Sequence, residues 1–253
     1  MISTSLASFQ HIWNRLGKAW QSVGIKGITS TIWSFFWMGF AGLRYGGRIA
    51  TWLATWFAPP YKKRRFLARY NSQGYIAPSA TIHHGNLQLG ANIFIGDRVK
   101  IIQDSDGGAV HLADRVHLHD DIVIQTGNGG SLKIGRDTHI QPRCQFAAYE
   151  TPIQIGCGVQ IAPHCVFESY SYLSQVPIIR ESQPSSKQAE IIVNDDVWIG
   201  HGSIISPGVQ IGKGAVIGSG AVVTQDIPEG AIAAGIPARV INFRSELVKN
   251  QPT

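Results

Sequence analysis

From residue 75 onward, the apolar positions of the chain recur every six residues. The apolar residue falls third in each hexad, and the hexads come in threes, at 89, 95, 101; 112, 118, 124; 134, 140, 146; 155, 161, 167; 193, 199, 205; and 211, 217, 223. Within each triplet the step is always six, whereas the steps between triplets are 11, 10, 9, 26 and 6. Insertions therefore occur only after every third hexad.

This spacing predicts a β-solenoid in which one hexad forms a short strand plus a turn and three hexads form one triangular coil. The recurring Ile, Leu or Val should point into a continuous interior, and the Gly, Asp or Asn that follows should take the corner. The insertions (102–109, 125–131, 147–152 and 168–190) must then leave from one shared corner. A stack of loops along one edge favours a binding site there, although surface loops that are merely tolerated are the alternative.

Before residue 71 the hexads are absent and two uncharged runs replace them. Residues 27–43 form the first, and residues 49–61 form the second, which is closed by KKRRFLAR. Both are short for a transmembrane helix, which needs about 20 apolar residues. The pairs Trp33/Trp37 and Trp52/Trp56 are spaced i,i+4, so each pair should share one helical face. We therefore divide the chain into a helical, Trp-rich segment at 1–70, a repeat domain at 71–242 and a tail at 243–253.

Charge is distributed unevenly between these parts. Residues 1–70 hold ten Lys/Arg and no Asp or Glu, and the remainder carries 12 Lys/Arg against 16 Asp/Glu. Six of the seven Trp lie in the same segment. Tryptophan and basic residues together favour helices that lie in, or dip into, an anionic membrane surface. The alternative is a helical cap whose aromatic residues pack on the repeat domain or on a partner subunit. The KKRR cluster has no recognisable nucleic-acid-binding fold around it, so we expect no nucleic-acid partner.

Cysteine usage and the N-terminus bear on the compartment. Cys144, Cys157 and Cys165 are an odd number without a CxxC pattern, which fits a reducing environment. Cys144 and Cys165 fall at equivalent small-residue positions of successive coils, which is typical of interior packing. No cleavable signal peptide is evident at the N-terminus. We expect a cytoplasmic protein that is peripheral on the inner face of a membrane.

The most specific stretch is DDVWIGHGSIISPGVQIGKGAVIGSGAVVTQDIPEGAIAAGIPARVI, residues 195–241. It resembles the closing coils and tail of sugar and xenobiotic O-acetyltransferases, and residues 75–242 resemble the hexapeptide-repeat acyltransferases. The resemblance implies a mainly β fold, a left-handed parallel β-helix, a homotrimer, and acetyl-CoA in a groove between two subunits, with no metal. Carried over by position, the cofactor groove would use Trp198, Gly200, Gly218, Ala221 and Thr224. Gln225 stands where the family often has Lys, and Arg239 would supply the compensating phosphate contact.

The implied activity is acyl-CoA-dependent O-acyl transfer to a saccharide or lipid-linked saccharide, and this chemistry needs a general base. In the family the base is a His a few residues after the interior residue that precedes the long insertion. Here Phe167 is that interior residue, Tyr172 stands five positions on, and no His occurs between 165 and 200. We expect His164, at the root of the insertion, to be the base, with Tyr172 or Glu168 as second choices.

His201 lies one coil further along, and we expect it near His164. Each of the two also has a structural interpretation. Arg98, Asp121, Arg143 and His164 take equivalent corner positions and would form a charge ladder, and His201 belongs to a common WIGHG motif. The alternative function, from another class, is an inactive β-helix scaffold that binds a membrane or a protein partner through residues 1–70.

Two further expectations concern outward positions on the flat faces. His117 and His139 should lie about 4.8 Å apart in adjacent coils, close enough to share a metal, but a third ligand is missing from the pattern. The zinc signature of the related γ-type carbonic anhydrases would require a His at Ser206. Phe94 and Trp198 are apolar outward residues, which suggests that these faces pack against neighbouring subunits.

Overall fold

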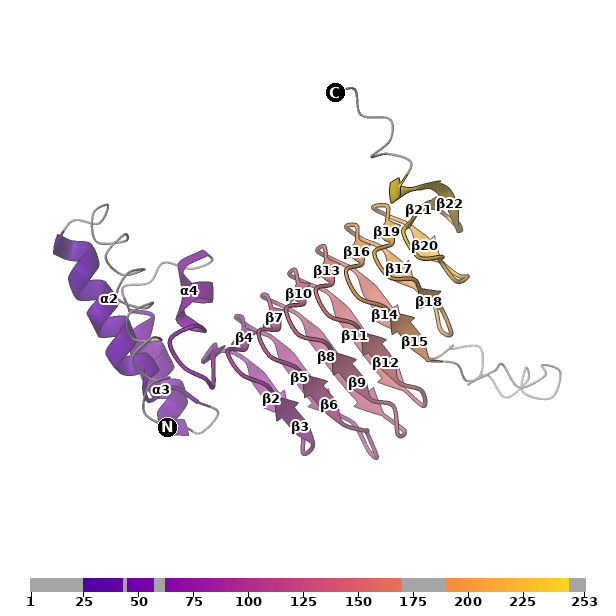
Figure 1. The fold of residues 1–253 in the computed structure, drawn as a ribbon. Helices are drawn as coiled ribbons and strands as arrows, with labels where there is room; N and C mark the ends of the chain where they lie inside the picture. Colours follow the sequence, from indigo (N-terminus) through magenta and orange to yellow (C-terminus); the bar gives the residue numbers. More distant parts are fainter. Residues whose placement is uncertain (1–24, 43–44, 57–61, 170–189, 246–253) are drawn as a thin grey trace, which may run out of the picture.

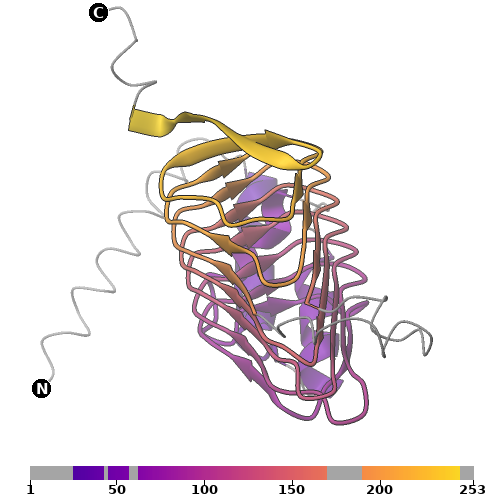
Figure 2. The same cartoon turned by 90° about the vertical axis from the view of Figure 1, so that its right-hand side faces the viewer.

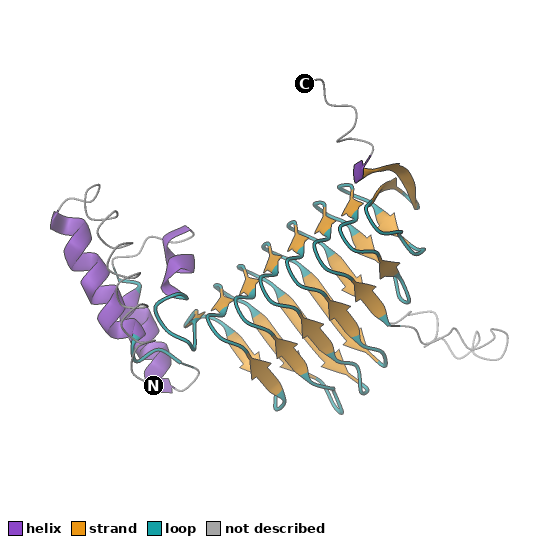
Figure 3. Ribbon diagram, viewed as in Figure 1, coloured by secondary structure: helices purple, strands orange, loops and turns teal. Residues whose placement is uncertain are grey.

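The computed structural model describes residues 25–42, 45–56, 62–169 and 190–245. From residue 75 the chain winds as a parallel β-solenoid, and a group of short helices lies at its N-terminal end (Figures 1 and 3). The fold class predicted from the hexads, mainly β with an N-terminal helical segment, is confirmed.

Three sheets form the three faces of the solenoid, and up to β20 each contains every third strand of the described part of the chain; β21 and β22 then extend the first sheet, with β22 antiparallel. Sheet A consists of β1 (Tyr75–Ile76), β4 (Phe94–Ile95), β7 (His117–Leu118), β10 (His139–Ile140), β13 (Gln160–Ile161), β16 (Trp198–Ile199), β19 (Val216–Ile217), β21 (Ala231–Gly235) and β22 (Ala238–Phe243). Sheet B consists of β2 (Thr81–His83), β5 (Lys100–Gln103), β8 (Val123–Gly127), β11 (Gln145–Tyr149), β14 (Val166–Glu168), β17 (Ile204–Ile205) and β20 (Val222–Val223). Sheet C consists of β3 (Leu87–Leu89), β6 (Val110–Leu112), β9 (Leu132–Ile134), β12 (Ile153–Ile155), β15 (Ile191–Val193) and β18 (Gln210–Ile211).

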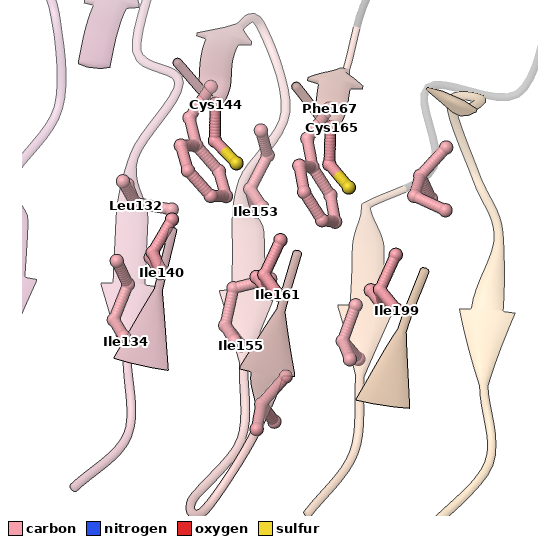
Figure 4. Close-up of a cluster of buried hydrophobic side chains, with 14 of the residues drawn as sticks. Leu132, Ile134, Ile140, Cys144, Ile153, Ile155, Ile161, Cys165, Phe167 and Ile199 are labelled. Carbon is pink, nitrogen blue, oxygen red and sulfur yellow. The ribbon is translucent and has the colours of Figure 1, made fainter. Parts of the chain in front are cut away.

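The interior is the column that the hexads predict. Every third-position residue named above is buried except Leu89, which is partly buried in the first coil. Equivalent residues stack along the axis, as Ile140, Ile161 and Ile199 do in Figure 4. The rings of Phe146 and Phe167 stack in the same way, with centroids 4.7 Å apart. Because each coil buries its apolar side chains only against its neighbours, the interior grows by addition of equivalent layers.

All the insertions leave from the corner between sheets B and C, as predicted. Part of two insertions is strand rather than loop, because β8 and β11 extend through Gly127 and Tyr149. Gln125, Thr126 and Gly127 pair with Ala147, Ala148 and Tyr149. Insertions of similar length in successive coils can continue the strand pairing, which satisfies their backbone hydrogen-bonding groups. The residues of the longest insertion from 170 to 189 lie outside the described part.

Three helices form the head, which we define as the described residues from 25 to 74. They are α2 (Ile25–Met38), α3 (Tyr45–Ala54) and α4 (Lys62–Leu67). None of the described helices is both long and apolar enough to cross a bilayer. The two Trp pairs do share helical faces, with ring centroids 5.8 Å apart for Trp33 and Trp37 and 5.1 Å apart for Trp52 and Trp56.

The head caps the first coil of the solenoid. The buried residues of this contact are Met38, Ala41, Ala54, Leu67, Ala68, Tyr75, Ala77 and Phe94. The Arg48 guanidinium donates to the carbonyl oxygens of Pro78 and Ala80, both at 2.6 Å. Arg64 pairs with Asp97 at 2.7 Å. The expectation that Phe94 faces a neighbouring subunit is wrong: its ring stacks on Tyr75 with centroids 5.3 Å apart and is buried by the head.

Candidate active site

The corner between sheets A and B carries the two histidines that the sequence singles out. His164 lies between β13 and β14, and His201 lies one coil further along, between β16 and β17. Both side chains are exposed, and their ring centroids are 5.2 Å apart at an interplanar angle of 63°. The prediction that they lie near one another is confirmed.

The backbone of this corner explains why His164 projects outward. His164 has a φ of +63°, and the equivalent residues Arg98, Asp121 and Arg143 have the same left-handed conformation. In the coils beyond, this position is held by Gly202 and Gly220. Left-handed backbone strongly favours glycine over other residues, so a non-glycine residue here costs some folding free energy.

Charge pairing explains why the earlier coils have charged residues, and not glycine, at this corner position. Arg98 binds Asp121 through two hydrogen bonds of 2.6 and 2.8 Å, and Arg143 approaches the same carboxylate at 3.9 Å. Arg98 holds the pKa of the Asp121 carboxyl below its usual range. The predicted ladder therefore runs from Arg98 to Arg143.

Beyond His164 the ladder has no further charged member. A Cβ built on Gly202 or on Gly220 would meet no atom within 4 Å, so the corner next to both imidazoles is open. An open surface beside two histidines gives a ligand room to approach their ring nitrogens. The two glycines are the residues that sequence reasoning missed. Their signal was present, because aligning the hexads shows the charged corner residue giving way to Gly at this point.

Buried side chains beneath the corner hold its backbone through hydrogen bonds. The Ser203 hydroxyl donates to the carbonyl oxygens of Gly200 and Gly218, and the Cys165 thiol donates to Gly200 at 3.1 Å. Cys144 and Cys165 are fully buried, which confirms the expected interior packing (Figure 4). A hydrogen bond with Cys165, together with burial, raises the pKa of the Cys144 thiol, so this residue is no nucleophile.

The predicted cofactor residues fall into two groups. Trp198 is 56% exposed on β16, three residues before His201, and points outward from sheet A. Thr224 is exposed just after β20, at the far end of sheet B, and Arg239 is exposed on β22, where its Nη1 donates to the Ala238 carbonyl. Of these three side chains, Trp198 is the one on the coil of His201, at the end of sheet A that leads into the corner.

The second group consists of the small residues Gly200, Gly218 and Ala221, which allow successive coils to stack. Ala221 is fully buried, and a Cβ on Gly200 would lie 2.6 Å from the Ser219 nitrogen. The N–H groups of Gly200 and Gly218 donate to Ile217 and Ala233, so they are already used within the solenoid. These three residues let the coils stack closely and offer no side chain to a ligand.

His164 lies at the corner that leads into the last strand before the long insertion, as the hexads predict, but it does not lie at the root of the insertion itself. His164 precedes β14, whereas the insertion leaves after β14, at the corner between sheets B and C. The strand crosses one face of the solenoid between them, so His164 is not at the root of the insertion. Tyr172 lies outside the described residues. Ser169 begins the insertion and is held there by its hydroxyl, which donates to the Tyr149 and Thr151 carbonyls.

His117 and His139 also meet as expected, with ring centroids 4.3 Å apart in adjacent coils. His117 is buried beneath the head, and its surroundings include the guanidinium groups of Arg65 and Arg69. Two cations nearby disfavour a further positive ion. Among the described residues, no three His, Cys, Asp or Glu side chains come together in a group that could hold a metal.

Comparison with known proteins identifies the repeat. Residues 190–225 match the family model for the bacterial transferase hexapeptide (six repeats). A 2,3,4,5-tetrahydropyridine-2,6-dicarboxylate N-acetyltransferase from Staphylococcus aureus (strain JH9) is 53% identical over 57 residues, 22% of this chain and 24% of that protein. The chain thus aligns with about a quarter of the length of such curated relatives.

One solved structure shares the solenoid. The polysialic acid O-acetyltransferase OatWY matches with a TM-score of 0.50 and 20% identity, covering 65% of this chain and 85% of that one. The polySia-specific acetyltransferase NeuO matches with a TM-score of 0.47 and 24% identity, covering 65% and 87%. The hexads, the three-sheet solenoid and the family match together show that residues 190–225 are a bacterial transferase hexapeptide repeat, which continues the hexads of the preceding coils.

Proposed function

We propose that this protein is an acyl-CoA-dependent O-acyltransferase that moves an acetyl group to a hydroxyl of a saccharide. The observation that carries the proposal is the His164–His201 pair at an open corner, in coils next to and within the family match. The acetyltransferase relative shares 53% identity over its matched segment and supports acetyl transfer. The choice of oxygen and of a saccharide rests on the likeness of residues 195–241 to sugar O-acetyltransferases.

The reaction requires one proton to move and one bond to be exchanged. We assign His164 as the general base that takes the proton of the acceptor hydroxyl. The hydroxyl oxygen attacks the thioester carbonyl, the C–S bond of acetyl-CoA breaks, and the sulfur leaves and takes up the proton. Products are the acetyl ester and free CoA. We assign to His201, whose ring centroid is 5.2 Å away, a hydrogen bond to the negative oxygen of the tetrahedral intermediate.

Trp198 is the residue we assign to the acyl donor on these coils. Its exposed indole offers a flat apolar surface on which the pantetheine arm of CoA could lie. In the assembly we propose, a homotrimer, a neighbouring subunit would complete the groove from the other side. Thr224 and Arg239 lie further away on the closing coils and are assigned to the nucleotide phosphates.

Turnover with acetyl-CoA tests the proposal directly. Release of free CoA thiol is measured with a panel of mono- and oligosaccharides, and acetyl-CoA binding is measured by calorimetry. His164→Ala should lower turnover by a factor of about 10²–10⁴, the usual effect of losing a general base, while acetyl-CoA affinity stays within about twofold. His111→Ala is the control, because His111 lies on sheet C, away from the corner.

Three outcomes would change the assignment. Full turnover in His164→Ala together with a dead Tyr172→Phe would move the base to Tyr172, which we otherwise expect only to weaken acceptor binding. A loss of turnover in His201→Ala but not in His164→Ala would exchange the roles of the two histidines. No measurable acetyl-CoA binding by the intact protein would favour the inactive scaffold.

A further inference from the structure

The head exposes an unusual amount of apolar surface. Most of the large hydrophobic side chains that are exposed in the described residues lie here: Ile32, Trp33, Phe35, Phe36, Phe40, Ile49, Trp52, Trp56, Phe66 and Tyr70. The face of the head that packs on the first coil is already buried. The exposed residues are therefore surplus to what capping the solenoid requires.

Ring contacts join many of these side chains into continuous surfaces. Phe36 touches both Trp37 and Phe40, with centroids 5.4 and 5.5 Å apart. Phe35 of α2 meets Tyr70, just after α4, at 5.7 Å. Soluble monomers rarely expose contiguous apolar patches larger than a few hundred Å² unless something binds them.

The charge of the segment indicates what covers this surface. Residues 1–70 contain ten Lys/Arg and no acidic residue. Exposed Arg69 lies over the ring of exposed Phe66 at 5.3 Å, so basic and aromatic groups share one face. Aromatic rings at the level of lipid headgroups, beside basic side chains, are typical of helices bound in the plane of an anionic membrane. A hydrophobic protein partner would explain the rings but not the absence of acidic residues.

We propose that the head docks onto an anionic lipid bilayer and stands the solenoid on its N-terminal end. The helices lie across that end of the solenoid, with α3 and α4 against β1 and α2 packed on them (Figures 1 and 2). The Arg48 bonds and the Arg64–Asp97 pair fix the head to the first coil. The solenoid axis therefore points away from the membrane.

In this orientation, the edge between sheets A and B runs from the bilayer toward the histidine pair. Trp52 and Trp56 line a hollow of about 400 Å³ with Pro78, Ser79 and Asp97, which lie at the start of the edge between sheets A and B. His164 lies on the same edge after β13, four strands of sheet A beyond β1. Four coil steps of about 4.8 Å hold it roughly 20 Å beyond the first coil. Resting on the proposed function, this distance implies an acceptor whose sugar stands well clear of its membrane anchor.

Fluorescence of the full chain tests the docking. In Trp198→Phe every remaining tryptophan lies in residues 1–70, so quenching by brominated lipid reports on this segment alone. We expect strong quenching with vesicles that contain anionic lipid, little with purely zwitterionic vesicles, and a decrease as salt is raised. Lack of quenching by anionic vesicles at low salt would overturn the proposal.

Co-sedimentation with the same vesicles tests the aromatic face. Trp52 and Trp56 are 52% and 61% exposed, and Trp52→Ala with Trp56→Ala should lower the vesicle partition coefficient roughly tenfold or more, because two large apolar side chains no longer bury area in lipid. Ile241→Ala is the matched control: Ile241 is 67% exposed on β22, at the opposite end of the solenoid, and its loss should leave partitioning unchanged.

Turnover and light scattering distinguish docking on lipid from the alternatives. Turnover with a soluble acceptor should be equal in the double variant and the intact protein, so failure of docking and failure of the proposed function are distinguishable. If the protein instead ignores vesicles and self-associates, and the double variant lowers its mass in light scattering, the surface binds a second copy and the lipid proposal is wrong.

Discussion

His117 lies where the head packs on the solenoid, and this packing changes the pKa of its imidazole. It lies outward on β7, between Phe94 and His139, and becomes buried because the head covers this part of sheet A. Its Nδ1 is buried and has no hydrogen-bond partner among the described residues. Burial, followed by His139, Arg65, His119 and Arg69, lowers the pKa of His117 to about 3.

Stability should therefore depend on pH in a defined direction. The folded-state pKa of His117 lies below the ordinary value of 6.5, so the unfolded state binds more protons between these values. The stabilisation is complete above about pH 6.5 and is lost as the pH falls toward 3, at up to about 1.4 kcal/mol per pH unit for one such group. Burial likewise lowers the pKa values of His119 and His139 in the same region.

Denaturant unfolding at pH 7, 6, 5 and 4 measures this dependence. We expect the free energy of unfolding to decrease over this range, and His117→Gln to make the decrease shallower because one buried neutral imidazole is gone. An equal slope in the variant would show that His117 becomes protonated in the folded protein without cost.

At the scale of elements, two ion pairs of the same corner can be compared. Arg64 of α4 reaches Asp97 from the head, and its side chain is 23% exposed. Arg98 pairs with Asp121 between successive coils, and its side chain is 63% exposed. Solvent screens an exposed pair more than a half-buried one, and only the first pair joins the head to the solenoid.

We expect Arg64→Met to lower the free energy of unfolding by about 1.5–3 kcal/mol, the range for losing a hydrogen bond to a charged group. Arg98→Met should cost clearly less, because solvent screens its exposed pair with Asp121. Denaturant unfolding of both variants gives the comparison, and limited proteolysis shows whether the head detaches first in Arg64→Met. Equal losses in the two variants would mean that the head is held by its apolar contact alone.

At the scale of the whole molecule, exposed apolar side chains lie on both faces that meet at the histidine corner. Trp198 points out from sheet A, and Ile204, flanked in register by Val166 and Val222, points out from sheet B. A groove between subunits at this corner would bury both surfaces. The site we propose is then complete only in the assembly.

The predicted assembly is a homotrimer, and light scattering at micromolar concentration measures its mass against the 27.6 kDa chain. Ile204→Glu should dissociate the trimer and lower turnover together, because a charge would be buried at the interface. Gln88→Glu, on sheet C, adds the same charge away from the corner and should change neither. A stable monomer with full turnover would exclude a shared site.

The six-residue spacing by itself determined the solenoid, its interior residues and the corner from which the insertions leave. This was possible because each coil repeats one local rule, and every strand pairs with the equivalent strand of the next coil. The same register placed His164 beside His201 and His117 beside His139, since neighbours across coils are fixed by counting alone.

Only the tertiary structure decided how the non-repeating parts meet the solenoid. The head follows no hexad, so sequence could not show that it buries Phe94 and His117 while leaving Trp52 and Trp56 exposed. These features depend on which surfaces come into contact in three dimensions, and the spacing of residues along a chain does not specify such contacts.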